Sequence, residues 1–193
     1  MQIEFRADGA RISGYVNAVE RESRPVMTPM GRVVEEIEAG AFARALERAG
    51  DVPATVDHDP ARVCASTGAG TLELREDAIG LHAELTVTDG EVIRRARRGE
   101  IKGWSFGMKN VQAELEERAD GLPLRRVKEL DLDHVTLVLD KCPVYSATSV
   151  EVRAGEENTL ETRAREDAWA GERYDNSEYR ERLNKIQKGR ENV

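Results

Sequence analysis

Short runs in which apolar and polar residues alternate recur along most of the chain. The clearest run spans residues 81–87, where His82, Glu84 and Thr86 separate apolar positions. Because successive side chains of a strand point to opposite faces, this run predicts a half-buried strand with His82 on its polar face. The apolar face is expected to contain Leu81, Ala83, Leu85 and Val87.

Further β patterns lie on both sides of this run. Residues 71–77 alternate in the same way, and the runs 125–140 and 145–153 predict two later strands. Two short runs flank Asp8-Gly9, a dipeptide typical of tight hairpin turns. Residues 21–32 instead carry two prolines and little periodicity, which predicts an exposed loop. The chain is therefore expected to be mainly β.

Two short helices are expected between the strands. Apolar residues recur at helical spacing between Gly40 and Gly50, and the second glycine is a typical helix end. The tetrapeptide Thr88-Asp89-Gly90-Glu91 resembles a capping box that begins at Thr88. It predicts a second helix, which ends at Gly99.

The last part of the chain differs in composition from the rest. Residues 155–193 are rich in Glu and Arg and poor in β-branched residues, which predicts a helical or disordered C-terminal tail. Tyr179, Leu183 and Ile186 form one weak apolar stripe there, suited to docking on a neighbour. A chain of 193 residues is long enough for one domain with a sizeable core. Residues 1–154 are expected to form that domain.

The pattern of charged residues limits the kinds of partner that the protein is expected to bind. A net charge of −8 disfavours a nucleic-acid-binding protein, which needs a basic stripe. The dense basic run Arg94–Arg98 is typical of the solvated face of a short helix. No apolar run approaches the ~20 residues that span a bilayer, and charged residues interrupt the N-terminal segment where a signal peptide is apolar. The expectation is a cytoplasmic protein without a membrane or nucleic-acid partner.

The segment Ile101–Met108 carries the most informative chemical signal. In a strand, Trp104, Phe106 and Met108 would share one bulky face. The opposite face would hold only Ser105 between two glycines. Glycines inside a strand mark places where another backbone or a ligand comes close, so Ser105 is a candidate nucleophile facing an extended peptide. The alternative is a glycine-flanked bend with an incidental serine.

A serine nucleophile needs a base, and the chain has three histidines. His58 lies in Asp57-His58-Asp59-Pro60, where carboxylates and a proline turn would hold an imidazole at a rim. His134 shares the spacing of Leu130, Leu132 and Val138, so it is expected to point toward the apolar side of its strand. Such a histidine is more often a core residue than a catalyst. His82, on a solvent face, is expected to be incidental.

Taken together, these segments resemble the caudoviral prohead serine protease family, whose members cut scaffold and capsid proteins inside the assembling phage head. The resemblance spans about residues 12 to 153. Its segments are Glu35-Glu36-Ile37 followed by Gly40-Ala41-Phe42 and Leu46, Asp57-His58-Asp59-Pro60, Ala65-Ser66-Thr67-Gly68 with Gly70-Thr71-Leu72, Arg98–Gly107, Leu130–Val138 and Tyr145–Arg153.

The family is distantly similar to the herpesvirus assemblins, which implies a closed or partly closed antiparallel β-barrel with short helices. The resemblance implies Ser105 as nucleophile and His58 as base. His134 stands where related phage proteins commonly carry an acidic residue, and assemblins use a second histidine, so His134 is the preferred third member. Asp133 and Asp131 remain alternatives. By the same analogy, the oxyanion hole would involve backbone near Lys141 and Cys142.

The implied function is a serine endopeptidase that cleaves phage major capsid and scaffold proteins, and also itself, inside the prohead in the host cytoplasm. A homodimer or higher homo-oligomer is a further expectation, and no cofactor or metal is implied. One alternative is a metal-dependent hydrolase that uses His58, His134 and either Asp57 or Asp59, although compact motifs such as HExxH are missing. The other is a non-catalytic β-barrel module for capsid assembly or scaffolding.

Overall fold

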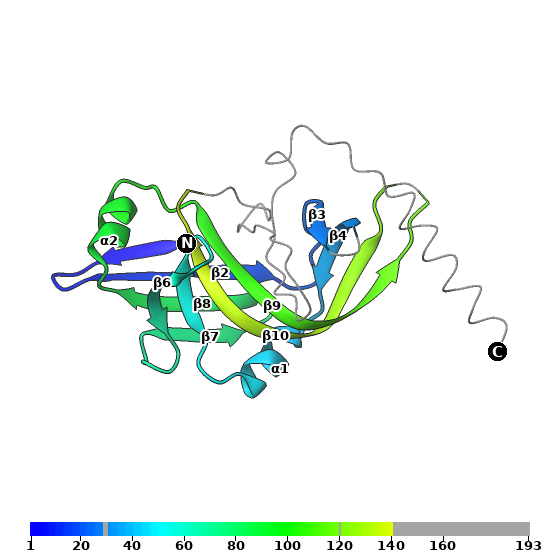
Figure 1. The fold of residues 1–193 in the computed structure, drawn as a ribbon, viewed down its shortest axis with the longest axis horizontal. Helices are drawn as coiled ribbons and strands as arrows, with labels where there is room; N and C mark the ends of the chain where they lie inside the picture. Colours follow the sequence, from blue (N-terminus) through cyan, green and yellow to red (C-terminus); the bar gives the residue numbers. More distant parts are fainter. Residues whose placement is uncertain (29–30, 120, 141–193) are drawn as a thin grey trace.

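The computed structural model describes residues 1–28, 31–119 and 121–140, and its described part is mainly β with two short helices (Figure 1). The predicted strand at 145–153 and the predicted tail at 155–193 lie outside the described residues. The elements in chain order are β1 (Gln2–Phe5), β2 (Ala10–Ala18), β3 (Val26–Thr28), β4 (Gly31–Ile37), α1 (Ala41–Arg48), β5 (Pro53–Val56), β6 (Asp59–Ser66), β7 (Leu72–Glu76), β8 (Gly80–Val87), α2 (Gly90–Arg97), β9 (Gly103–Glu116) and β10 (Leu124–Val138).

The strands form two sheets. The four-stranded sheet has the order β1-β2-β8-β7 and is antiparallel throughout, and its β1–β2 hairpin turns at the predicted Asp8-Gly9. The six-stranded sheet has the order β3-β4-β10-β5-β6, with β9 on the other edge of β10. In Figure 1, β9 and β10 curl together across the molecule as a half-barrel. Strand β10 pairs in parallel with both β4 and β5, so the prediction of a wholly antiparallel sheet is wrong.

One edge of β10 is shared by two strands, and α1 covers the gap between them. Residues 124–127 pair with β4, and residues 135–137 pair with β5. In between, the Arg44 guanidinium donates to the Lys128 carbonyl at 2.7 Å, and that of Arg48 donates to the Leu130 carbonyl at 3.0 Å. Backbone carbonyls that lack a neighbouring strand need such partners. Helix α1 therefore supplies hydrogen bonds to the part of β10 between β4 and β5. Strand β10 can thus continue without a break to the residues of the site.

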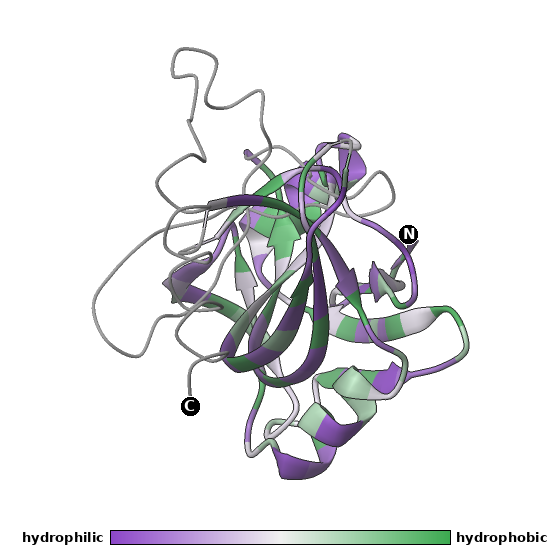
Figure 2. Ribbon diagram, turned by 90° about the vertical axis from the view of Figure 1, so that its right-hand side faces the viewer, coloured by the Kyte–Doolittle hydropathy of each residue, from purple (hydrophilic) through white to green (hydrophobic). Residues whose placement is uncertain are grey.

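The core confirms the predicted faces of two strands. On β8, the apolar face is at most 1% exposed. On β9, Trp104, Phe106 and Met108 are also at most 1% exposed, and the Phe106 ring meets the Phe42 ring of α1 edge-on at 5.2 Å between centroids. Figure 2 shows the strands banded in hydrophobic and hydrophilic colours, as alternation requires. This packing anchors the strand that carries Ser105.

Several local predictions need correction. The exposed loop predicted at 21–32 contains β3, whose Val26 is buried and pairs with Val33 of β4. Helix α2 is capped by Asp89 rather than Thr88, because the Asp89 carboxylate accepts from two backbone N–H groups of the first turn. His82 is half-buried against the Tyr15 ring rather than solvated, and burial lowers its pKa.

Candidate active site

The base predicted at His58 occupies a two-residue turn between β5 and β6. Val56 pairs with Asp59, and the two turn residues between them, Asp57 and His58, have φ angles of 51° and 60°. Positive φ at both positions is the type I′ turn, in which the second position is usually glycine. A histidine there stores backbone strain, and such strain often accompanies a functional site. The positive φ at His58 therefore indicates that its side chain is needed.

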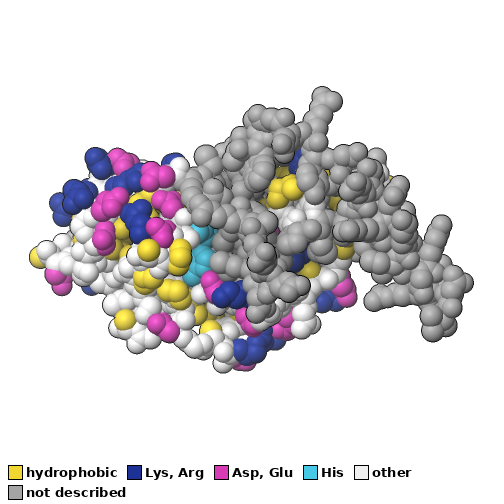
Figure 3. Space-filling view, in the orientation of Figure 1, with side chains coloured by type: hydrophobic (Ala, Val, Ile, Leu, Met, Phe, Trp, Pro, Cys, Tyr) yellow, Lys and Arg dark blue, Asp and Glu magenta, His cyan; other side chains and the backbone are white. Residues whose placement is uncertain are grey.

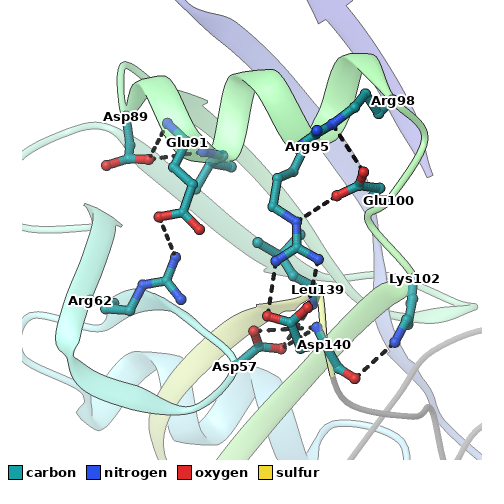
Figure 4. Close-up of polar contacts among 11 residues, drawn as sticks. Asp57, Arg62, Asp89, Glu91, Arg95, Arg98, Glu100, Lys102, Leu139 and Asp140 are labelled. Carbon is teal, nitrogen blue, oxygen red and sulfur yellow. Dashed lines mark hydrogen bonds and ion pairs between the residues drawn. The ribbon is translucent and has the colours of Figure 1, made fainter.

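Contacts from the end of β10 hold this strained turn. One Asp57 carboxylate oxygen accepts from the Leu139 N–H at 2.8 Å and from the Asp140 N–H at 3.1 Å (Figure 4). The Asp57 N–H donates to the Leu137 carbonyl at 2.9 Å, and the His58 N–H donates to the Thr136 hydroxyl at 3.0 Å. Both turn residues are thus bound through their backbone to the strand that also carries His134.

Helix α2 and the segment that follows it also bind the end of β10. The Arg95 guanidinium donates to both carboxylate oxygens of Asp140 at 2.9 and 2.6 Å, and Lys102 donates to the Asp140 carbonyl at 2.8 Å (Figure 4). Arg95 holds the pKa of Asp140 below its ordinary value. Arg98 pairs with Glu100, and Arg97 lies over the Phe5 ring, so several members of the basic run have structural partners, where a solvated face had been expected.

Strands β9 and β10 bring Ser105 and His134 to one face of the sheet. Ser105 pairs with Thr136, and Gly107 pairs with His134, so their side chains share a face. Leu132 pairs with Met108 on the core face, and a register shift separates Leu132 from His134. Such a bulge redirects the side chain that follows it. The prediction that His134 points to the apolar side with Leu132 is therefore wrong, because the bulge turns it toward Ser105.

Four side chains form one continuous series of hydrogen bonds, which we term the relay. The Ser105 Oγ lies 2.7 Å from His58 Nε2, and His58 Nδ1 lies 2.7 Å from His134 Nε2. The His134 Nδ1 then lies 2.8 Å from the Asp133 Oδ2. Ser105 is 0% exposed and His134 5%. The structure thus brings together Ser105, His58 and His134, and Asp133, the alternative third member, bonds to His134 behind them.

A lysine lies beside Asp133, the last member of the relay. Lys109 of β9 forms an ion pair with the second oxygen of Asp133. The hydrogen bond from His134, and then the contact with Lys109, lower the pKa of Asp133 to about 2. Asp133 is therefore a carboxylate at neutral pH.

Gly107 makes room for the second imidazole. A Cβ at this position would lie 2.4 Å from His134 Cε1 and 2.8 Å from its Nδ1, distances that side chains do not tolerate. The sequence suggested that the glycines beside Ser105 admit a substrate backbone. At Gly107, the close neighbour is instead a ring of the relay itself.

The remaining candidates from the sequence take other partners. The carboxylate of Asp131 accepts from Asn110 at 2.7 Å and lies 3.6 Å from Arg48, while that of Asp59 accepts from the Ala61 N–H. Within the described residues, no group of three or more His, Cys, Asp and Glu side chains is arranged to hold a metal. Lys141 and Cys142, the candidates for the oxyanion hole, lie outside the described residues.

Histidine side chains reach the molecular surface. Histidine atoms are visible near the middle of the face in Figure 3. Among the described residues, no helix is long and apolar enough to cross a membrane.

A serine hydroxyl bonded to an imidazole, which is itself oriented by a further group, is the arrangement of serine hydrolases. A family model described as caudovirus prohead serine protease matches residues 1–162, and the chain belongs to that family. The membership confirms the resemblance seen in the sequence and implies a serine protease of capsid maturation. No curated protein and no solved structure matches the chain. The similarity to assemblins stays an expectation.

Proposed function

We propose that the protein is a serine endopeptidase that cleaves the major capsid and scaffold proteins of a phage prohead, with Ser105 as nucleophile, His58 as general base and His134 as the group that orients His58. The observation that carries the proposal is the 2.7 Å contact between Ser105 Oγ and His58 Nε2, made from a strained turn. Family membership supplies the substrate class.

The chemistry follows from this contact. His58 Nε2 takes the hydroxyl proton as Ser105 attacks the scissile carbonyl, and the resulting imidazolium gives that proton to the leaving amine. The acyl-serine ester is then hydrolysed when His58 takes a proton from water and returns it to Ser105. His134 holds the His58 ring through Nδ1, so that Nε2 faces the hydroxyl.

The main competing function is a β-barrel module for capsid assembly in which Ser105 and both histidines are structural. Two observations favour the enzyme. A turn that served only to connect β5 and β6 would gain stability from glycine at His58, since the φ angle there is 60°. Burying a polar network also costs free energy unless every member is hydrogen-bonded, and apolar side chains would fill the same space at a lower cost in free energy. A purely structural module would therefore have little reason to keep this network.

The metal-hydrolase alternative is disfavoured by the occupied ring nitrogens. His58 and His134 direct nitrogens at each other, and their other nitrogens face Ser105 and Asp133. The Asp57 carboxylate is bound to the backbone of β10. A metal bound by both rings would have to break these contacts.

The decisive experiment compares Ser105→Ala with Ser13→Ala, which changes a serine in the other sheet. Purified proteins are incubated with the cognate capsid and scaffold proteins, and new termini are mapped by mass spectrometry. We expect Ser105→Ala to fold normally and to lose about 10⁴-fold or more in cleavage rate, because it removes the nucleophile. Ser13→Ala should cleave normally. Equal cleavage by the Ser105→Ala protein would refute the assignment.

Inhibitors separate the remaining alternatives. A fluorophosphonate should label the unaltered protein at Ser105 and leave Ser105→Ala unlabelled. Activity that survives the phosphonate and disappears with a chelator would favour the metal enzyme.

Two further measurements address self-cleavage and assembly. Termini mapped after incubation of the protein alone would reveal self-cleavage, and light scattering would determine whether the protein forms a homo-oligomer.

A further inference from the structure

The relay does not end at His134. Its last hydrogen bond, 2.8 Å from His134 Nδ1, reaches the carboxylate of Asp133. Successive side chains of a regular strand point to opposite faces and cannot bond to each other in this way. The register shift between Leu132 and His134 removes that restriction, because Asp133 is the extra residue of the bulge. The bulge thus gives His134 both a new direction and an adjacent carboxylate.

An ionised carboxylate at this place determines the direction of every hydrogen bond in the relay. A carboxylate can only accept a hydrogen bond, so His134 Nδ1 must carry a proton and donate a hydrogen bond to Asp133. In a neutral ring, His134 Nε2 is then an acceptor, and His58 Nδ1 must donate to it. His58 Nε2 is consequently left as an acceptor that faces the Ser105 hydroxyl. This is the tautomer that a general base requires.

We propose that Asp133, held by Lys109, is a positioning residue that fixes the tautomers of His134 and His58 and stabilises the cation formed when Ser105 attacks. The proposal rests on the proposed function, since it assigns a role in the same relay. Among the described residues, the His134 ring bonds to Asp133, which is paired with Lys109 of β9, and to His58 in the β5–β6 turn.

The proton balance is the same as in a three-member relay. The hydroxyl proton moves from Ser105 Oγ to His58 Nε2 as the new carbon–oxygen bond forms, and one positive charge appears on His58. The Nδ1–H of His58 donates to neutral His134, whose Nδ1–H donates to the Asp133 carboxylate. Asp133 is not protonated in this scheme. Its negative charge, one ring away, offsets the positive charge that His134 alone stabilises poorly.

The test compares Asp133→Asn with Asp131→Asn, its matched control two positions earlier on β10. The Asp131 carboxylate contacts Asn110 and Arg48 and no member of the relay. We expect Asp133→Asn to lower kcat about 10²-fold with KM nearly unchanged, because it perturbs the base and not the substrate contacts. Asp131→Asn should retain the kcat of the unaltered protein. Equal kcat values for the two variants would overturn the proposal.

A spectroscopic readout separates positioning from general stability. Long-range ¹H–¹⁵N correlation of the imidazole nitrogens should show His134 protonated on Nδ1 in the unaltered protein and in Asp131→Asn. In Asp133→Asn, the His134 signals should shift toward a mixture of tautomers, because an amide both donates and accepts. An unchanged tautomer would count against the proposal even if the variant were less stable.

Lys109→Met provides an intermediate case. It removes the ion pair of Asp133 and leaves the carboxylate beside His134. We expect its loss in kcat to be smaller than that of Asp133→Asn, and a loss as large would shift the role from Asp133 to Lys109. Failure of the proposed function is a separate result: an active Ser105→Ala would refute the protease, whereas an inactive Ser105→Ala with a fully active Asp133→Asn would refute only the role of Asp133.

Discussion

Each histidine of the relay follows an aspartate in the sequence, and the two aspartates do different things. Asp57 precedes His58 in the β5–β6 turn and bonds to the backbone N–H groups of Leu139 and Asp140. Asp133 precedes His134 in the bulge of β10 and bonds to the imidazole ring itself. The local sequences are alike, so the difference lies in the backbone.

The comparison shows how backbone geometry assigns a role to a carboxylate. In the turn, φ angles of 51° and 60° direct the Asp57 carboxylate to the end of β10 while the ring of His58 reaches Ser105. In the bulge, the extra residue places Asp133 and His134 close enough for their side chains to bond. Asp57 thus holds the backbone of the turn in place, whereas Asp133 bonds to an imidazole of the relay.

The largest expected effect comes from replacing His58 with either Ala or Gly. Both variants lack the proposed base, so each should lose about 10⁴-fold in cleavage rate. Their stabilities should differ, because an L-residue with a left-handed backbone is strained and glycine is not. We expect His58→Gly to be more stable than His58→Ala by about 1 kcal/mol in urea unfolding.

Ala54→Gly, in the neighbouring strand β5, is the control for that measurement. There, glycine should lower stability, as it does in regular strands. If His58→Gly were no more stable than His58→Ala, the turn would not be strained, and the contrast between turn and bulge would lose its basis.

A methyl group at Gly107 should disturb the bulge without removing any member of the relay. The Cβ of Gly107→Ala would overlap the His134 ring, which would have to move away from His58. Displacement of a catalytic group by about 1 Å can cost about 10²-fold in rate. Overpacking should also destabilise the fold by about 1–3 kcal/mol. Cleavage assays at a temperature well below unfolding would separate the two effects.

Gly50→Ala is the matched control, because nothing lies within 4 Å of a Cβ at that position. It should leave both rate and stability close to those of the unaltered protein. Full activity in Gly107→Ala would indicate that His134 can shift without consequence for His58.

The sequence predicted the elements of the site better than their relative orientation. The alternation of Trp104, Phe106 and Met108 correctly predicted which face of β9 packs in the apolar core and which carries Ser105. Periodicity failed at His134, because a single inserted residue reverses the face, and nothing in the local pattern marks where the insertion falls. The sequence Asp-Leu-Asp-His left both Asp133 and Asp131 as alternative acidic members of the site, and the bulge is what brings Asp133 to His134.

The fold, like the site, was predicted from the sequence only in part. Strands β7, β8, β9 and β10, both helices and the β1–β2 hairpin follow from alternation, spacing and turn residues, whereas β4 and β6 were not predicted. The parallel pairing of β10 with β4 and β5 was missed, because it joins segments far apart in the sequence, and local periodicity carries no information about direction. Strand β3 was missed because its three residues are too short for a period to be read.

A smaller effect, on stability, is expected at Asp57. Asp57→Ala leaves the Leu139 and Asp140 N–H groups without their acceptor, and an unsatisfied buried donor costs about 1–3 kcal/mol. We expect a loss of about 2 kcal/mol in urea unfolding, together with lower activity as the turn loosens. Asp57→Asn keeps one acceptor oxygen and should lose less. If Asp57→Ala were as stable as the unaltered protein, the carboxylate would not be what holds the turn.

The smallest effect expected is the contribution of Asp133 to stability in acid. Its pKa is lowered to about 2 in the folded protein, so the unfolded chain binds the proton more tightly. The stabilisation is therefore complete above the ordinary pKa of about 4 and is lost as the pH falls toward 2.

The whole contribution of Asp133 to stability is on the order of 2 kcal/mol, because one pKa unit corresponds to about 1.4 kcal/mol. The stability advantage of the unaltered protein over Asp133→Asn should thus shrink by about 1–2 kcal/mol between pH 5 and about pH 2.5. Other carboxylates with lowered pKa values, such as Asp51 and Asp77, titrate in both proteins and cancel in the difference. Parallel stability curves would mean that neither His134 nor Lys109 holds Asp133 in its ionised form.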